Sequence, residues 1–459
     1  MMTVGDIVDA TGGRLIGFPE GDISGVSTDS RNITAGELFV ALRGENFDGH
    51  SYLSTSSELG AAAALCDESW LRGHQPPDGM TVIAVADTLR ALGDLARWQR
   101  NRYDIPVVGI TGSNGKTTCK EMLATILEQL GPGLRTAGNL NNLIGLPRMI
   151  FMLTADHGWA VLEMGMSELG EIDRLAEIAA PQVGIVLNAF PAHLESMGSV
   201  ENVAVAKGEL LLRLPPGGTA IVNADDPLIS RCPSPAGVAR ISFGLGNADV
   251  RGENIHQLGI NGQEFTLVIA EKSYPVRLSA FGRHAIYNAL AAAAGAHALG
   301  LPIELIANGL QLFRPYDKRF SLEQVGGFYL IDDSYNANPA STGAALATLA
   351  DLKGEHSAFV ALGDMLELGG NEADLHRMIG VQAAQVADRL YLFGALGEFT
   401  AEAAVSAGMP PEHVIRGRSH AEIAADILGR AGAGDFIMLK GSRGMKMDTV
   451  AEHIRASFR

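Results

Sequence analysis

One stretch of this chain constrains its fold more than any other: VVGITGSNGKTTCKEMLATILEQLG, residues 107–131. It opens with a short β-branched run. Apolar side chains then recur at helical spacing, at Met122, Leu123, Ile126, Leu127 and Leu130. The stretch therefore predicts a strand, a glycine-rich turn and the N-terminus of a helix. Such a turn directs backbone N–H groups and the positive end of the helix dipole at one point, which favours a polyphosphate ligand.

The turn departs from the usual G-x-x-x-x-G-K-[ST] phosphate-binding pattern, because Ile110 stands where the first glycine is expected. Gly112 and Gly115 still let a ligand approach the backbone, and Lys116 can reach the β and γ phosphates. A tight turn with a surface lysine is the alternative. The conjunction of T-G-x-x-G-K-T-T with a strand and a helix favours a nucleotide site.

Composition bounds the remaining possibilities. A chain of 459 residues favours two to three domains. Its net charge of −17 argues against a nucleic-acid partner. Three isolated cysteines indicate neither a disulfide framework nor a zinc site, and suit a reducing compartment. With no signal-peptide pattern and no run of about 18 apolar residues, we expect a cytoplasmic protein without a membrane span.

The patterns divide the chain into three predicted domains, all of the α/β class. Residues 1–85 predict a small α/β domain, with a helix over Leu53–Ala64. Residues 86–314 open with a helix at 87–103 and continue into a central P-loop ATPase-like domain with a parallel sheet, which turns to short alternating strands after Gly244. Residues 315–459 alternate strand and helix, which predicts a Rossmann-like, doubly wound sheet with a site at its carboxyl edge.

A magnesium nucleotide needs oxygen ligands, and several residues could supply them. The hydroxyl of Thr117 or Thr118 follows the loop lysine. Glu163 comes directly after an apolar strand, in WAVLEMG, although a strand-end glutamate in solvent has the same pattern. His193, in NAFPAHLE, follows the next strand and could bind metal or serve the structure.

Lys207 is unusual because it shares a helix face with apolar residues. It lies at helical spacing from Val203, Leu210, Leu211 and Leu214. A lysine in such a stripe either extends its ammonium to solvent or loses its charge. Carbamylation would give it a carboxylate-like head that could bind a second Mg²⁺. The sequence leaves both readings open.

These motifs together resemble those of the Mur ligase superfamily, which includes the folylpolyglutamate synthetases and whose own loop is T-G-[ST]-x-G-K-[ST]. The resemblance covers nearly the whole chain. It rests on STDSR, GELFVALRGENFDGH, TGSNGKTT, GNLNNLIGLP, LEMG, PAHLE, AKGEL, GRHAIYNALAAAA, DDSYNANPAS, LGDMLELG and LKGSRGMKMD. DDSYNANP and GDMLELG are most similar to the members that join D-alanyl-D-alanine to UDP-N-acetylmuramoyl-tripeptide.

The resemblance implies a role for each matching position. The triphosphate falls to Gly112, Ser113, Asn114, Gly115, Lys116, Thr117 and Thr118. Mg²⁺ falls to Thr117, Glu163, His193 and Lys207. The remaining nucleotide contacts are Asn288 for adenine, with His284 one turn before it, Arg319 for the γ-phosphate, and Asp333, Tyr335 and Asn336 for ribose and base. The implied catalytic set is Lys116, His193, Lys207 and Arg319.

The same resemblance implies a nucleotide-sugar substrate bound in residues 1–85 and nearby. Its contacts would be Ser30, Arg31, Asp48, His50, Asn139, Asn141 and Asn142, although any single asparagine can equally serve a turn. The stretch before His193 is less glycine-rich than is usual for the family, which puts its loop shape in question.

The implied reaction is ATP-dependent peptide-bond formation through an acyl phosphate, with Mg²⁺, in the cytoplasmic stage of peptidoglycan synthesis. We expect a monomer that takes small-molecule substrates and closes at a hinge near Phe313–Arg319. His193 or Asp333 could take the proton of the amine. The alternatives are a sister ligase that adds a single amino acid, either the third residue of the stem peptide or a folate glutamate, and a protein whose phosphate loop only switches conformation.

Overall fold

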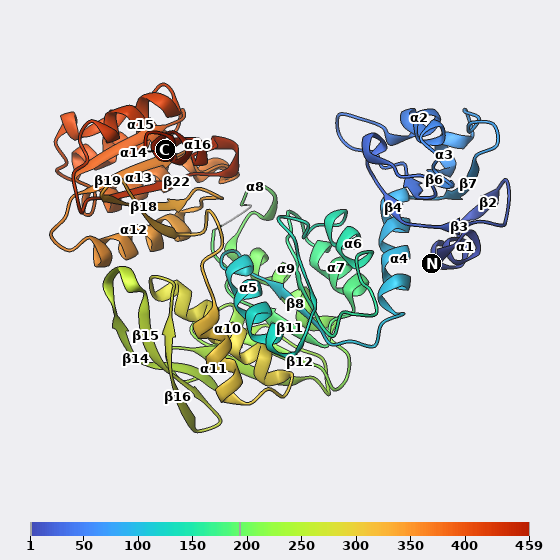
Figure 1. Ribbon diagram of the computed structural model, residues 1–459, viewed down its shortest axis with the longest axis horizontal. Helices are drawn as coiled ribbons and strands as arrows, with labels where there is room; N and C mark the ends of the chain where they lie inside the picture. The colour runs from blue at the N-terminus through green and yellow to red at the C-terminus, as the bar shows by residue number, and fades with distance from the viewer. Residues whose placement is uncertain (1, 192–193, 459) are drawn as a thin grey trace. The chain divides into compact units, whose positions relative to one another are not determined.

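The computed structural model describes residues 2–191 and 194–458. It forms two compact units. The first contains residues 1–109, 131–166 and 170–182, and the second contains residues 110–130, 167–169 and 183–459. Each unit combines helices with β-sheet (Figure 1), which confirms the predicted α/β class.

The first unit begins with a five-stranded sheet in the order β2-β7-β6-β5-β4. β2 runs antiparallel to β7, and the other neighbours are parallel. Leu38 and Val40 of β5 belong to one apolar core and Phe39 to another, because successive strand residues face opposite sides. The elements are β1 (Met2–Thr3), α1 (Val4–Thr11), β2 (Arg14–Ile16), β3 (Asp22–Ile23), β4 (Val26–Ser27), β5 (Leu38–Val40), α2 (Leu53–Glu58), β6 (Ala63–Asp67), α3 (Glu68–Leu71) and β7 (Thr81–Val85).

The helix predicted over Leu53–Ala64 is wrong in its second half. α2 ends at Glu58, and Gly60 adopts a φ of 92°. A residue with positive φ cannot continue a right-handed helix. Ala63 then begins β6, all five residues of which are buried. Burial inside the sheet overrides the helix propensity of its alanines.

The rest of the first unit follows residue 86. The helix predicted at 87–103 is confirmed in its core, because the Asp87 carboxylate caps it by accepting the N–H groups of Leu89 and Arg90. β9 and β10 are parallel, and β10 ends at Glu163. The elements are α4 (Thr88–Arg100), β9 (Leu134–Arg135), α6 (Gly145–Ile150), β10 (Ala160–Glu163) and α7 (Glu171–Ala179).

The second unit contains the end of β8 and a long sheet in the order β16-β15-β14-β13-β12-β11-β8. β11 to β14 are parallel, and β14, β15 and β16 form an antiparallel meander, as the pattern after Gly244 predicts. α5 packs closely on α11, since a Cβ at Gly309 would lie 2.6 Å from Cα of Ile126. The elements are β8 (Val107–Thr111), α5 (Lys116–Leu127), β11 (Val183–Val186), α8 (Leu194–Met197), α9 (Val200–Leu212), β12 (Thr219–Asn223), β13 (Ala239–Gly244), β14 (Val250–Gln257), β15 (Gln263–Ile269), β16 (Lys272–Leu278), α10 (Arg283–Ala298) and α11 (Ile303–Leu312).

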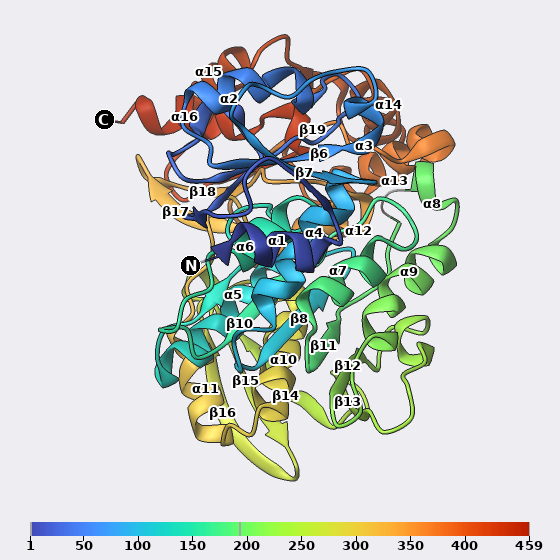
Figure 2. The ribbon, with the colours of Figure 1, turned by 90° about the vertical axis from the view of Figure 1, so that its right-hand side faces the viewer.

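The C-terminal part of the second unit is a six-stranded sheet in the order β17-β18-β22-β19-β20-β21. It is parallel apart from the antiparallel pair β17 and β18. Helices cover both faces (Figures 1 and 2), as the prediction of a doubly wound sheet requires. The elements are β17 (Ser321–Val325), β18 (Phe328–Asp333), α12 (Pro339–Lys353), β19 (Ala358–Gly363), α13 (Glu372–Ala384), β20 (Arg389–Phe393), α14 (Gly397–Ser406), β21 (Val414–Arg416), α15 (His420–Leu428), β22 (Phe436–Lys440) and α16 (Asp448–Ala456).

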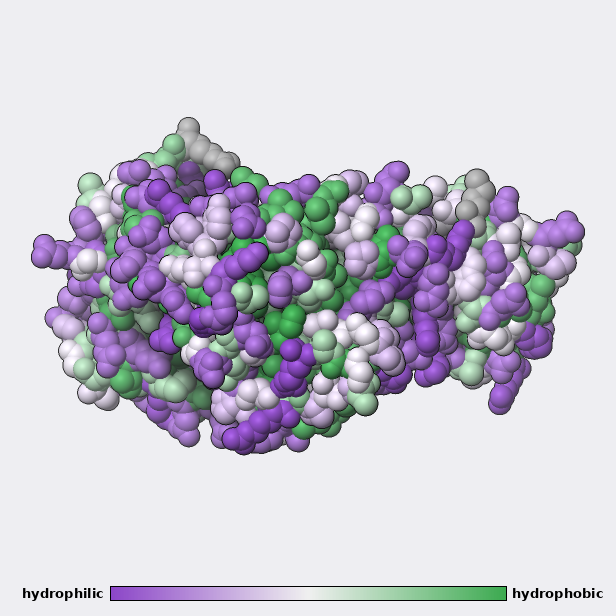
Figure 3. Space-filling model, turned by 90° about the horizontal axis from the view of Figure 1, so that it is seen from below, coloured by the Kyte–Doolittle hydropathy of each residue, from purple (hydrophilic) through white to green (hydrophobic). Residues whose placement is uncertain are grey.

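The surface carries mostly polar residues on the face drawn in Figure 3, with smaller apolar groups between them. Within residues 2–191 and 194–458, none of the helices has both the length and the apolar character that a membrane crossing requires.

Candidate active site

The predicted phosphate loop joins β8 to α5. Its backbone depends on two glycines: a Cβ at Gly112 would lie 2.8 Å from Cβ of Leu187, and a Cβ at Gly115 would collide with the amide oxygen of Asn288. Gly115 is the N-cap of α5, with a φ of 88° and no side-chain cap. Because glycine has no side chain, the N-cap residue offers no oxygen to the first turn of α5, and the positive end of the helix dipole points at the loop, as in an anion site at a helix N-terminus.

Lys116 reaches back across this loop. Its Nζ donates a hydrogen bond to the carbonyl oxygen of Gly112 over 2.6 Å. The ammonium thus lies beside the glycine-rich turn that precedes Lys116 in the chain. There it would meet the phosphates of a bound nucleotide.

Asn188 holds the tip of the loop and was not singled out from the sequence. Its Oδ1 accepts the N–H of Asn114 over 2.9 Å, and its Nδ2 donates to the carbonyl of Asn114 over 3.1 Å. Its own carbonyl accepts the N–H of Ser113 over 3.1 Å. Asn188 follows β11 at the carboxyl edge of the sheet, and that position is the signal that could have revealed it.

The segment around Asn188 is itself anchored from the end of β12. Asn223 donates from Nδ2 to the carbonyl of Leu187 over 2.9 Å, and Asp226 accepts the N–H of Ala189 over 2.9 Å. The loop conformation is therefore supported through two layers of hydrogen bonds.

Arg319 lies against the same loop. Its Nη2 donates to the hydroxyl of Thr117 over 3.2 Å, and its guanidinium lies 3.8 Å from the centre of the Tyr335 ring. Its Nε is buried and has no hydrogen-bond partner among the described residues. A guanidinium with a buried, vacant donor is suited to an anionic ligand.

Two residues of α10 lie close by. Asn288 is buried against Gly115. His284, one turn earlier, has a buried Nδ1 with no partner among the described residues. Burial lowers the pKa of His284, against the opposing effect of Asp333, so the imidazole is held in its neutral form.

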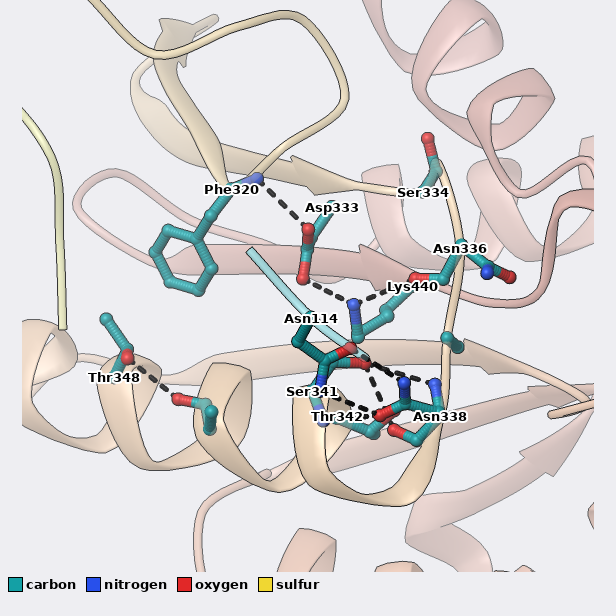
Figure 4. A network of polar contacts seen from close by, with 12 residues as sticks. Asn114, Phe320, Asp333, Ser334, Asn336, Asn338, Ser341, Thr342, Thr348 and Lys440 are labelled. Atoms are coloured by element: carbon teal, nitrogen blue, oxygen red, sulfur yellow. Dashed lines mark hydrogen bonds and ion pairs between the residues drawn. The ribbon is translucent and has the colours of Figure 1, made fainter. Parts of the chain in front are cut away.

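The predicted ribose and base contacts cluster at the end of β18 (Figure 4). The Asp333 carboxylate accepts a hydrogen bond from the N–H of Phe320 over 3.1 Å. It also forms an ion pair with Lys440, whose Nζ lies 2.6 Å away. Lys440 also donates to the carbonyl of Asn336 over 3.0 Å. Lys440 lies in the motif LKGSRGMKMD, and the sequence alone predicts no role for it. Its buried ammonium at the end of β22 orients both Asp333 and the Asn336 backbone.

Lys207 lies on α9 with 3% of its surface exposed, which disfavours the alternative of an ammonium extended to solvent. Burial lowers the pKa of Lys207 well below its ordinary value, and the charge of Lys116 lowers it further. The apolar stripe predicted around it is confirmed for Val203, Leu210 and Leu211, which are buried.

Glu163 is the last residue of β10 and is 1% exposed, so the alternative of a solvent glutamate is excluded. Its N–H donates to the Thr136 hydroxyl over 2.8 Å. His193 lies outside the described residues. Within the described part of the chain, no group of three His, Cys, Asp or Glu side chains could hold a metal ion. The predicted Mg²⁺ role of Thr117, Glu163 and Lys207 therefore stays a prediction.

The predicted substrate asparagines lie in the first unit. Asn142 forms the turn that leads into α6, since its Oδ1 accepts the N–H groups of Ile144 and Gly145 over 3.2 and 2.8 Å. Asn141 accepts the N–H of Gly165 at its carbonyl over 2.8 Å, and Asn139 is exposed. Asn142 therefore serves a turn, which is the alternative that the sequence left open. The side chain of Asn139 is exposed to solvent.

The remaining substrate candidates are mostly engaged in local contacts. Arg31 pairs with Asp29 over 2.8 Å, next to Ser30. His50 is buried: its Nε2 accepts the N–H of Asp67 over 2.9 Å, so its Nδ1 carries the proton and donates to Asp48. Their roles toward a substrate stay predictions.

Comparison with known proteins identifies the class. Three family models match the chain: the Mur ligase family catalytic domain at residues 22–100, the Mur ligase middle domain at 110–296, and the Mur ligase glutamate ligase domain at 318–443. The chain belongs to the Mur ligase family, as its motifs predict.

Within that family, two relatives with the same name match most of the chain. The chain is 36% identical to the UDP-N-acetylmuramoyl-tripeptide–D-alanyl-D-alanine ligase of Bacillus subtilis, covering 98% of each chain, and 40% identical to that of Escherichia coli, covering 86% of each. Among solved structures it resembles MurF from Acinetobacter baumannii, with a TM-score of 0.89, 31% identity and 99% coverage of both chains. It also resembles MurF from Thermotoga maritima in complex with ADP, with a TM-score of 0.83, 26% identity, and coverage of 94% of this chain and 97% of that one.

Proposed function

We propose that this protein joins D-alanyl-D-alanine to UDP-N-acetylmuramoyl-tripeptide at the expense of ATP. The observation that carries the proposal is the phosphate loop, where a helix that begins after Gly115 lies beside the side chains of Lys116 and Arg319. The relatives that cover most of the chain carry the name of this activity.

The chemistry explains why such a loop is needed. A carboxylate is a poor acyl donor, because an attacking amine would have to expel an oxide. Transfer of the γ-phosphoryl group to the terminal carboxylate of the tripeptide gives an acyl phosphate and ADP. The amine of D-alanyl-D-alanine then attacks the acyl carbon, and phosphate leaves. Positioning and charge neutralisation carry most of the catalysis in such transfers.

The residues of the chain take distinct parts in this reaction. The α5 N-terminus and Lys116 bind the phosphates, while Arg319 offers its free Nε to the γ-phosphate. Asn288 and the β18 end, through Asp333, Tyr335 and Asn336, hold the adenosine. Asp333 already accepts from Phe320 and Lys440. His193 and Asp333 both remain candidates for the proton of the amine.

The donor set fits magnesium, which takes hard oxygen ligands. Thr117 and Glu163 offer a hydroxyl and a buried carboxylate, and His193 would complete the set. Lys207 would contribute oxygen only as a carbamate, which forms by addition of CO₂ to a neutral amine, the form that its burial favours. When bound, Mg²⁺ neutralises charge on the transferring phosphoryl group.

Phosphate release tests the proposal. The purified protein is given ATP, Mg²⁺ and UDP-N-acetylmuramoyl-tripeptide, with D-alanyl-D-alanine, a single amino acid or no acceptor. We expect release only with the dipeptide. Turnover with a diamino acid on the dipeptide precursor, or with glutamate on a folate, would assign the chain to a sister ligase. Nucleotide binding without any acceptor-dependent release would favour a conformational switch.

We further propose that the protein acts in the cytoplasm as a monomer, closing at Phe313–Arg319. Its substrates are small molecules of the stage that precedes membrane transfer, and its net charge of −17 suits no nucleic-acid partner. Light scattering after size-exclusion chromatography should give a mass near 48.3 kDa, and a doubled mass would contradict the monomer.

A further inference from the structure

The side chains of Asn114 and Asn338 face each other across two hydrogen bonds (Figure 4). Asn338 Nδ2 donates to Asn114 Oδ1 over 2.7 Å, and Asn114 Nδ2 donates to Asn338 Oδ1 over 3.3 Å. Asn114 is at the tip of the phosphate loop. Asn338 comes 224 positions later, where α12 of the C-terminal sheet begins. The amide pair therefore joins the loop to another part of the same compact unit.

The orientation of the Asn338 side-chain amide is set by its role as the N-cap of α12. Asn338 is the N-cap of α12, and its Oδ1 accepts the N–H of Ser341 over 2.8 Å. Ser341 completes a capping box by accepting the Asn338 N–H over 3.1 Å. Because the cap requires an oxygen on that side, the NH₂ group of Asn338 must point the other way, toward Asn114.

The backbone of Asn114 does not depend on this contact. Asn188 already satisfies both its N–H and its carbonyl. The Asn114 side chain, in contrast, contacts only Asn338 among the hydrogen bonds of the described residues. The Asn114 side-chain amide therefore links the position of the phosphate loop to the position of α12.

We propose that Asn338 is a positioning residue for the phosphate loop, coupling its conformation to the docking of the C-terminal sheet. This inference rests on the proposed ATP-dependent function. The segment that leads into α12 contains Asp333, Tyr335 and Asn336, the predicted adenosine contacts, while the loop provides the predicted phosphate contacts. The amide pair brings both halves of the nucleotide site together before the nucleotide binds. An arrangement assembled in advance raises affinity, because less ordering remains to be done on binding.

Two variants separate this role from helix capping. Asn338→Ser keeps an N-cap hydroxyl for α12 but is too short and lacks the amide that bonds Asn114. Asn114→Ala removes the other half of the pair and leaves the loop backbone intact. Ser419→Ala is the matched control, because Ser419 caps α15 by accepting the N–H of Glu422 and has no role at the loop.

The measurement is the dissociation constant for ADP with Mg²⁺, by titration calorimetry on the full chain. We expect each of the two asparagine variants to weaken binding about three- to tenfold, the effect of one or two neutral hydrogen bonds. The double variant should bind no more weakly than the weaker single variant, since both changes remove one interaction. Ser419→Ala should bind as the wild type does.

Unchanged ADP binding in Asn114→Ala, or fully additive losses in the double variant, would overturn the proposal. If Asn338→Ser lowers the melting temperature, the double variant decides, because a direct phosphate contact of Asn114 would add its loss to that of Asn338→Ser, whereas a shared amide pair would not. ADP binding needs no acceptor, so a wrong assignment of the acceptor would appear in the phosphate-release assay and leave this test untouched. In turnover, Asn338→Ser should raise the KM for ATP by more than it lowers kcat, because the lost amide pair acts on nucleotide binding.

Discussion

The Nη2 atom of Arg319 donates a hydrogen bond to the hydroxyl of Thr117, 202 positions earlier in the chain. Thr117 lies in the first turn of α5, and Arg319 belongs to the segment that leads into the C-terminal sheet. The bond places a permanent cation beside the helix N-terminus predicted to hold the triphosphate. The stacking of that guanidinium on Tyr335 fixes its plane.

Arg319→Lys is expected to lower kcat by about 10²- to 10³-fold, the typical cost of losing a preorganised donor to transition-state charge. A lysine keeps the charge but cannot both stack on Tyr335 and present several fixed donors. Phosphate release at saturating substrates measures the effect. Arg418→Lys is the control, because the Arg418 side chain is 90% exposed. Comparable kcat values for Arg319→Lys and the wild type would remove Arg319 from the reaction.

Lys440→Met should destabilise the protein because it leaves the Asp333 carboxylate without its cation in a largely buried position. Breaking a buried ion pair costs about 3–5 kcal/mol, which corresponds to a fall in melting temperature of roughly 6–20 °C. Lys353→Met is the matched control, since its partner Asp388 is half exposed; it should cost less than about 1 kcal/mol. Scanning calorimetry measures both melting temperatures. Equal decreases in the two variants would show that the ion pair of Lys440 and Asp333 stabilises the protein no more than an exposed pair does.

The sequence was sufficient for features that depend on local pattern. The strand, turn and helix around Gly115 could be read directly, as could the buried stripe that contains Lys207, because both follow from spacing along one segment. The helix over Leu53–Ala64 failed at Gly60, where a left-handed turn and a place inside the sheet outweighed helix propensity.

The supporting residues of the site could not be predicted in the same way. Asn188 follows the end of β11 and Lys440 ends β22, and each acts on a partner more than 70 positions away in the chain. Their side chains are common ones at sheet edges, so nothing in their local pattern distinguishes them. Only the order of strands in the folded sheets brings them to the loop and to Asp333.

His284 should make stability depend on pH on the acid side of neutrality. Burial lowers its pKa in the folded state from an ordinary value of 6.5. Below about pH 6.5 the unfolded chain takes up a proton that the folded protein does not, so stability falls as the pH falls, and no such effect exists above. Relative to His284→Gln, the wild type should lose up to about 1.4 kcal/mol per pH unit in this window.

Urea unfolding of the two proteins at pH 7.5, 6.5, 5.5 and 5.0, followed by fluorescence, measures this difference. The variant and the wild type should show parallel behaviour between pH 6.5 and 7.5 and then diverge. Parallel curves down to pH 5 would mean that the buried imidazole is protonated as readily in the folded protein as in the unfolded chain.

Lys207→Ala is expected to abolish activity, by 10²-fold or more, if the buried amine acts as a carbamate that binds Mg²⁺. Its lowered pKa and 3% exposure favour the neutral amine that CO₂ requires. A short carboxylic acid such as formate or acetate would fill the vacated space and supply the missing oxygens, so either should restore part of the phosphate release. Lys116→Ala is the control, because a carboxylate cannot replace an ammonium that faces phosphates, and the acids should not rescue it. Full activity of Lys207→Ala without any added acid would rule out an essential carbamate and leave Lys207 a neutral residue of the α9 core.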